Sequence, residues 1–327
     1  MVRTAGILAA LAVTFSSLHA HADSKAWTAA KAGLPADAKI VIGVDFAAVQ
    51  KTELFATYYP KLLEKAEAAK EIDTLKDTCK IDPLAAVQGV VIAMSSDQKD
   101  GAFYIGLSGV DRAKLSSCIQ LAAQIKADKA DKADKADKAD KAAAEKPVKV
   151  LLKQDGNITQ LSNGMETSYF GWVGKDVIVV SLHTEDRASL VKWMGGKGAL
   201  AKSSLGKSLA RTNTTATLWG AGEETKELEA GVSAKGGYGA LKFSKGTLDA
   251  DVHAVMENAA QATKMATSVT KQVDEAKQGG QLPPMFVAML KSVTIAAVSD
   301  EVVLKANVAE KDLAQLVGLA IAGIGGP

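Results

Sequence analysis

Short apolar runs with alternating or β-branched character are separated along this chain by stretches that have helical spacing. Residues 39–45 (KIVIGVD), 87–94 and 103–107 have the pattern of strands bounded by turn residues. Residues 54–70 and 111–125 instead place apolar side chains three and four positions apart, which favours helix. The mixture of both patterns in one chain predicts an α+β fold.

A unit of two strands, a short polar turn and a following helix recurs along the chain. Copies of this unit open their helix on the motif Asp-x-Ala-x-Leu, which begins at Asp111, Asp186 and Asp312. A looser copy at residues 238–255 leads into a predicted helix at 256–276 and lacks the motif. An aspartate at a helix start accepts hydrogen bonds from unpaired backbone N–H groups. The repeat predicts a curved antiparallel sheet with helices on one face, built from strand–turn–strand–helix units.

The middle of the chain has less regular patterns. Residues 203–211 favour a helix, residues 214–219 a strand, and residues 222–229 a short acidic helix. Changes in composition divide the chain into a leader, an N-terminal α+β half, a linker, a middle α+β segment and a C-terminal α+β segment. We expect these parts, in the same order, at residues 1–22, 23–125, 126–147, 148–230 and 231–327.

The expected linker is distinctive because Lys-Ala-Asp is repeated in it from Lys126 to Lys141. Alanine and Asp-to-Lys pairs four positions apart favour helix. A repeat of three residues does not match the helical period of about 3.6, so no apolar stripe persists on one face. We interpret the tract as a linker with little function of its own, either a solvated helical extension or a flexible spacer. A docking arm is the alternative.

The N-terminus has the features of a cleavable secretory signal peptide. Arg3 supplies a positive start, residues 5–18 are apolar and uncharged, and residues 20–22 (AHA) fit the small-x-small pattern of signal peptidase. The apolar stretch is shorter than the roughly 20 residues needed to cross a bilayer. We expect cleavage between Ala22 and Asp23 and a protein that is periplasmic or secreted. An uncleaved N-terminal anchor is the alternative.

The rest of the sequence limits the functions that suit an exported chain. Residues 313–324 are the most apolar later stretch, but they are too few to span a membrane and favour a buried terminal helix. We therefore expect no transmembrane segment in the mature chain. The formal net charge is only +2, which leaves no electrostatic footprint for nucleic acid.

The two cysteines of the chain are Cys79 and Cys118. An even count in an exported protein predicts a disulfide, worth roughly 3–4 kcal/mol in the chain-entropy model. Two free buried thiols are the alternative. The spacing excludes a catalytic Cys-x-x-Cys pair.

A few local motifs suggest a relationship to other proteins. They are residues 34–37 (LPAD) before the strand KIVIGVD, residues 79–83 (CKIDP) before VVIAM, and Cys118 in the following helix. In these features the chain resembles a group of uncharacterised exported α+β proteins of Gram-negative bacteria. The resemblance implies a sheet-and-helix fold in two halves and no assigned activity. The Lys-Ala-Asp tract departs from the group and looks like an insertion.

Motifs for catalysis are scarce. Residues 201–208 match a relaxed phosphate-loop pattern, but no strand is predicted directly before them, so we expect no nucleotide binding. Outside the leader the histidines are His183 and His253. His183 has Glu185 and Asp186 beside it. These groups fit a strand-end surface, and a weak cation site is the alternative.

His253 lies in an alternating strand with Asp249 and Asp251 on the same face. Polar groups at a period of two are typical of the solvated side of a sheet, and a shallow divalent-cation site is the alternative. The sequence contains no Gly-x-Ser-x-Gly motif. We therefore predict no catalytic residue, no metal site and no cofactor.

This scarcity of catalytic groups favours a non-catalytic protein that binds an unknown envelope partner or acts as a scaffold. The contact surface would be the concave face of the sheet or a groove between sheet and helices. The second hypothesis is a periplasmic carrier of a lipid or other apolar ligand, enclosed beneath the helix expected within residues 255–273. The third is a hydrolase that uses a serine and His183.

Overall fold

The computed structural model describes residues 23–65, 68–137, 149–163, 166–229, 231–279 and 282–324. The expected leader, including Ala22, and the last part of the Lys-Ala-Asp tract lie outside these residues. The strands are β1 (Ile40–Asp45), β2 (Val87–Met94), β3 (Gly101–Leu107), β4 (Leu151–Asp155), β5 (Ile158–Ser162), β6 (Thr167–Val173), β7 (Val177–Ser181), β8 (Leu218–Gly222), β9 (Lys226–Glu229), β10 (Val232–Ser244), β11 (Thr247–Met256), β12 (Thr294–Val298) and β13 (Glu301–Ala309). The helices are α2 (Lys25–Gly33), α3 (Phe46–Val49), α4 (Glu53–Lys65), α5 (Ala68–Cys79), α6 (Pro83–Ala86), α7 (Arg112–Asp137), α8 (Arg187–Met194), the 3₁₀ helix η1 (Ala199–Lys202), α9 (Ser204–Arg211), α10 (Ala259–Gln278), α11 (Pro284–Lys291) and α12 (Glu310–Ile324).

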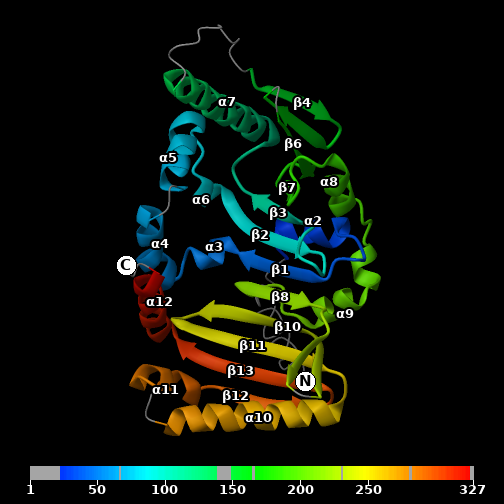
Figure 1. The fold of residues 1–327 in the computed structure, drawn as a ribbon, viewed down its shortest axis with the longest axis vertical. Helices are drawn as coiled ribbons and strands as arrows, with labels where there is room; N and C mark the ends of the chain where they lie inside the picture. Colours follow the sequence, from blue (N-terminus) through cyan, green and yellow to red (C-terminus); the bar gives the residue numbers. More distant parts are fainter. Residues whose placement is uncertain are drawn as a thin grey trace, which may run out of the picture.

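A 13-stranded antiparallel sheet organises these elements (Figure 1). Its strand order is β12-β13-β11-β10-β8-β1-β2-β3-β7-β6-β5-β4, and β9 pairs with β10 off this path. The sheet is curved and stays open, so β12 and β4 are its two ends. The predicted α+β class with a curved antiparallel sheet is confirmed.

The helices α2, α8 and α9 cover one face of the central strands. Trp27 of α2 meets Trp219 of β8 edge to face, with ring centroids 4.6 Å apart. Tyr104 of β3 is fully buried and donates a hydrogen bond to the carbonyl of Trp193 in α8. These contacts form the main core of the molecule.

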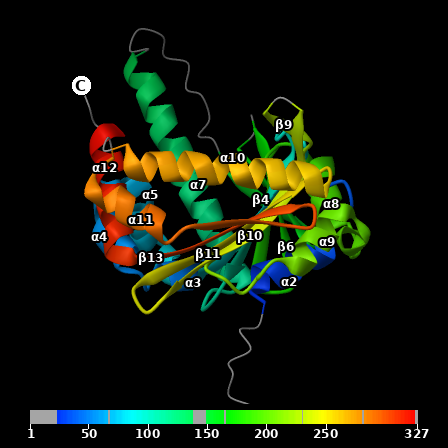
Figure 2. The same ribbon diagram turned by 90° about the horizontal axis from the view of Figure 1, so that it is seen from below.

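The helices α7 and α10 lie on the opposite face (Figure 2). Ala262 and Ala266 of α10 pack on a second cluster of buried residues that includes Met256 and Val302. The structure thus adds cover on the second face of the sheet to the one-sided cover that the sequence predicts. Both faces of the central strands carry apolar side chains, and each needs cover from solvent.

Local patterns misplace several elements. The acidic helix expected at residues 222–229 is wrong, because the end of β8 and the strand β9 occupy this range. Pairing of β9 with β10 across the left-handed Gly231 (φ 70°) overrides the local helical preference. The strand expected at 214–219 is Leu218–Gly222. The range 54–70, expected as a helix, contains most of α4 and the start of α5. The hairpin β4–β5 is absent from the sequence prediction.

The helix α7 includes the first part of the Lys-Ala-Asp tract, because it runs on to Asp137. At its start it packs against α5, and a disulfide joins the two helices there. Cys79 and Cys118 are bonded with a Cα–Cα distance of 5.3 Å, so the predicted disulfide is confirmed. The tract is helical up to Asp137, which favours the helical extension over a flexible spacer in that part.

The repeated aspartates lie at helix starts in different ways. Asp186 caps α8 by accepting a hydrogen bond from the N–H of Ala188. Asp111 accepts one from the N–H of Lys114 at the start of α7. Asp312 differs, because α12 already begins at Glu310 and Asp312 lies within the first turn.

Candidate functional site

Among the strands that the structure describes, β12 forms one end of the sheet and pairs with β13 on one side only. Its sequence is TIAAV, and the turn Ser299-Asp300 connects it to β13. Val298 opposes Glu301 next to this turn, and Ala296 opposes Val303. Ser299 has a φ of 56°, the left-handed conformation that tight hairpin turns require.

The register fixes which backbone groups of β12 face outward. In an antiparallel hairpin with a two-residue turn, the residues that flank the turn exchange hydrogen bonds, and bonding then alternates along the strand. Thr294, Ala296 and Val298 therefore direct their N–H and C=O groups towards β13. Ile295 and Ala297 direct theirs away from the sheet, where an added strand could pair with them.

The composition of β12 leaves this edge unprotected. Natural edge strands are commonly blunted by charged residues, proline or bulges. β12 contains none of these, and Val298 is 56% exposed. The opposite end of the sheet differs, because β4 carries Lys153 and Asp155, and Asp155 forms an ion pair with Arg187 at 2.7 Å.

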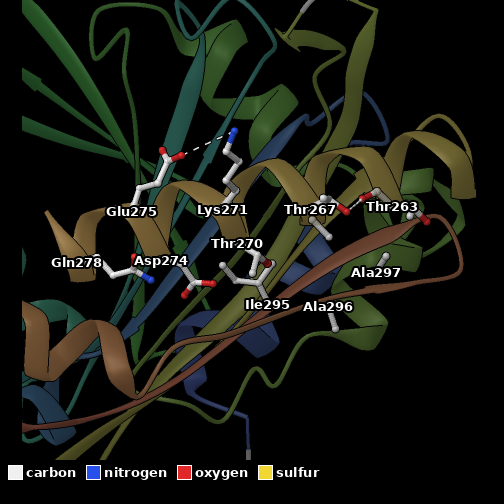
Figure 3. A pocket seen from close by; sticks show the side chains of 11 residues that line it. Thr263, Thr267, Thr270, Lys271, Asp274, Glu275, Gln278, Ile295, Ala296 and Ala297 are labelled. Carbon is white, nitrogen blue, oxygen red and sulfur yellow. Dashed lines mark hydrogen bonds and ion pairs between the residues drawn. The ribbon is translucent and has the colours of Figure 1, made fainter.

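A groove of about 600 Å³ runs between β12 and α10 (Figure 3). Ile295, Ala296 and Ala297 form its floor at the sheet edge. One stripe of α10 forms its wall and is composed of Thr263, Ala266, Thr267, Thr270, Lys271, Asp274, Glu275 and Gln278. The groove is open to solvent along its length.

The sequence of α10 explains why this wall is accessible. Asn258 caps the helix by accepting a hydrogen bond from the N–H of Gln261. Ala262 and Ala266 are buried against the sheet and bring the helix close to it. The threonines lie on the neighbouring stripe, and the hydroxyls of Thr263 and Thr267 donate to carbonyls of their own helix. Their methyl groups thus remain as surface for a ligand.

The charged groups near the groove neutralise one another. Lys271 pairs with Glu275 at 3.7 Å, and Lys277 pairs with Asp274 at 3.1 Å. Figure 3 shows Lys271 and Glu275 on the side of α10 away from Ile295, whereas Thr270 and Asp274 lie on the near side. The central part of the groove is therefore lined by small side chains, and its net charge is close to zero.

A buried carboxylate anchors the hairpin that presents this edge. Glu301 of β13 is 4% exposed and forms an ion pair with Arg211 of α9. Its Oε2 accepts a hydrogen bond from the hydroxyl of Tyr238 at 3.0 Å and lies 3.0 Å from Nδ1 of His253. The Nε2 of His253 lies 3.0 Å from Asp251. These contacts tie β13 to β10, β11 and α9.

The protonation of this cluster follows from burial and hydrogen bonding. Burial alone would raise the pKa of Glu301, but the hydrogen bonds from Arg211, His253 and Tyr238 outweigh it and lower that pKa below its ordinary value. Burial, followed by the hydrogen bond to Glu301 and its charge, raises the pKa of Tyr238 to about 12. The carboxylate is thus held ionised beside a neutral phenol.

The structure places Asp249, Asp251 and His253 on one face of β11, as their spacing predicts. In the part of the chain that the structure describes, no group of three or more His, Cys, Asp or Glu residues is arranged to hold a metal ion. The ring of His253 stacks on Tyr238 with centroids 4.4 Å apart. His253 therefore belongs to the packed cluster around Glu301.

The contacts of the His183 ring in the described part of the chain are with a backbone carbonyl and a carboxylate. Its Nε2 lies 2.8 Å from the carbonyl of Lys99, and its Nδ1 lies 3.7 Å from Glu185. The hydroxyl of Ser181 donates its hydrogen bond to the backbone carbonyl of His183 and not to the imidazole ring.

The candidate phosphate loop at residues 201–208 lies in helical structure. Its Gly206 and Lys207 are part of α9, and the cap residue Ser203 accepts a hydrogen bond from the N–H of Gly206. These backbone donors serve the helix and its cap.

The predicted first residue of the mature chain is held by the fold. Asp23 pairs with Lys31 of α2 and accepts a hydrogen bond from Thr214 at 3.0 Å. Of the helices described, none combines the length and the apolar content needed to cross a bilayer.

Sequence reasoning missed the groove and most of the cluster behind it. The place of Thr294–Val298 at the sheet edge depends on the order of all the strands. Arg211, Tyr238 and Glu301 are far apart in the sequence and meet only in the folded sheet. The absence of charge and proline in TIAAV was the one local signal that could have marked this strand.

The comparisons with known proteins leave the family open. No family model matches the sequence, and no curated protein matches it. The solved structure of crystal form III of TP0453 aligns with a TM-score of 0.48 and 10% identity over 88% of this chain and 96% of that chain. Crystal form I of TP0453 aligns with a TM-score of 0.45 and 9% identity over 88% and 95%. A likeness at this level carries no argument about function, and the resemblance to uncharacterised exported proteins stays a prediction.

Proposed function

We propose that this chain is an exported, non-catalytic binding or scaffold protein of the cell envelope that holds an extended polypeptide strand against β12. The observation that carries this proposal is an uncharged edge strand beside a helix-walled groove. Backbone groups of Ile295 and Ala297 would bond to the added strand, and the small side chains of α10 would cover it. A polypeptide is the ligand class whose own N–H and C=O groups match this edge.

Export is supported by the signal-peptide pattern and by the disulfide between Cys79 and Cys118. The carrier hypothesis has less support. Ala262 and Ala266 sit directly on the sheet, and the groove beside them is open and partly lined by hydroxyl and charged groups. The hydrolase hypothesis also has less support, because the nearby Ser181 hydroxyl bonds to the backbone carbonyl of His183 and the ring of His183 contacts the carbonyl of Lys99.

Selection of displayed random twelve-residue peptides on the purified protein tests the proposal. We expect enriched peptides to be extended and rich in β-formers, because they would add a strand to the edge of the sheet. Ala297→Pro removes one outward N–H and should weaken these peptides by at least about tenfold. Gln154→Pro, an outward position of the opposite edge strand β4, is the matched control and should leave their affinity unchanged.

Two results would overturn the proposal. One is a selection on protein kept monomeric by dilution that yields no peptide above background. The other is peptides that bind Ala297→Pro as tightly as the unmodified protein.

A further inference from the structure

We infer that the strand held at β12 is β12 of a second copy of this chain, so that two copies form a two-fold dimer with one continuous sheet. The inference rests on the proposed function, because it needs strand addition at the same edge. A second copy is the proposed occupant because the outward backbone groups of β12 are arranged symmetrically about Ala296.

The backbone groups of β12 are self-complementary. The outward-facing residues Ile295 and Ala297 lie symmetrically on either side of Ala296. An antiparallel pair with its two-fold axis at Ala296 places Ile295 of one copy opposite Ala297 of the other. Each such pair exchanges N–H···O=C bonds in both directions. A register shifted by two residues would retain only one such pairing, so the axis at Ala296 is favoured.

The helices above the edge fit this arrangement. α10 lies over the outermost strands β12 and β13, so its symmetry mate would run antiparallel to it about two strand spacings away, roughly 10 Å. Helices with small contact residues pack at about this separation. The threonine half of one groove wall, residues 263–270, would face Asp274 and Gln278 of the second copy.

The charges at the two ends of β12 are also complementary. Asp300 follows the strand, and the exposed Lys291 precedes it. Antiparallel pairing brings the Asp300 end of one copy beside the Lys291 end of the other. β12 itself contributes no like charges across the axis, so nothing in the strand opposes the pairing.

Sedimentation equilibrium over a wide concentration range tests the dimer. We expect a reversible monomer–dimer equilibrium for the purified protein and for Gln154→Pro. Ala297→Pro should raise the dimer dissociation constant by at least about tenfold, since it removes one interchain bond from each copy. The unfolding midpoint of each variant is measured in the same buffer. An unchanged midpoint shows that a weaker dimer is not caused by misfolding.

Cysteine cross-linking tests the register. Ala296→Cys places two thiols opposite each other at a non-hydrogen-bonded position, where Cα atoms are about 4.5 Å apart and a disulfide can form. Val298→Cys is the matched control, because Val298 is also exposed but opposes Thr294 of the second copy. Mild oxidation should cross-link the first variant into a covalent dimer, whereas the second should form no covalent dimer.

The outcomes separate this inference from the proposed function. A protein that stays monomeric at all concentrations, with peptides still bound at β12, overturns only the second copy as occupant. A dimer that persists unchanged in Ala297→Pro, or equal cross-linking of both cysteine variants, overturns the assigned interface. Absence of both the dimer and peptide binding overturns the proposed function as well.

Discussion

Glu301 connects the candidate edge to the rest of the fold at the scale of single side chains. A carboxylate that is 4% exposed is costly to bury unless cations and donors satisfy it. Arg211, Tyr238 and His253 do so from three different elements. The cluster therefore fixes the position of β13, and through the β12–β13 hairpin it fixes the edge that carries the groove.

The lowered pKa of Glu301 gives a pH-dependent contribution to stability. A folded-state pKa below the ordinary value of about 4.3 means that the contribution is complete above that pH. It is lost as the pH falls through the folded pKa. Glu301→Gln should reduce the free energy of unfolding by on the order of 2 kcal/mol at pH 7, and the difference should shrink below about pH 4. Urea unfolding from pH 3 to pH 8 measures this.

Glu224 is an exposed glutamate and provides the control. Glu224→Gln should leave the free energy of unfolding within about 0.5 kcal/mol at every pH. A Glu301→Gln variant that is as stable as the unmodified protein at pH 7 would show that the cluster does not hold the hairpin.

The sequence predicts only part of the cluster around Glu301. The period-two spacing of Asp249, Asp251 and His253 correctly predicts that they share a face of one strand. Their partners come from β10, β13 and α9, and no local pattern relates these segments. Asp249 is exposed and Asp251 partly exposed to solvent, as expected for this face, whereas the His253 side chain is only 19% exposed because it stacks on Tyr238.

At the scale of elements, the disulfide joins the C-terminus of α5 to α7. Both helices lie beside the sheet, and α7 continues into the Lys-Ala-Asp tract. Cys118 is buried with Ile81 and Ala86, so the bond closes a small apolar cluster. Without it, α5 would be held by its packing against α7 and by its contacts with α4 and α6.

Removal of this bond should be costly. The Cys79→Ser/Cys118→Ser double variant opens a loop of 39 residues, which corresponds to about 4 kcal/mol in the chain-entropy model. Urea unfolding at neutral pH measures the loss, and the reduced unmodified protein should resemble the double variant. A loss below about 1 kcal/mol would indicate that contacts of α5 with its surroundings replace the bond.

Elements with strong local patterns were predicted well, and elements set by pairing were not. The runs KIVIGVD and VVIAM are strands, and residues 111–125 are helical, because their apolar periodicity agrees with their final burial. Residues 222–229 look helical by composition, but residues 226–229 form the strand β9 because they pair with β10. The place of β12 at the sheet edge, which defines the candidate site, is a property of the whole strand order.

At the scale of the whole molecule, the sheet is a long open surface with two unlike ends. The β4 end carries charged side chains and lies near α7, whereas the β12 end is uncharged and lies beneath α10. Closing one end by pairing and blunting the other is how an open sheet avoids unlimited edge-to-edge growth. We therefore expect one specific contact for each copy and no further assembly.

Amide hydrogen exchange resolved at single residues of β12 tests the central claim most directly. When a strand is bound, from either a selected peptide or a second copy at high concentration, the amides of Ile295 and Ala297 should become protected. The amides of Ala296 and Val298 already bond to β13 and should change little. Unchanged exchange at Ile295 and Ala297 in the saturated complex would contradict strand addition at this edge.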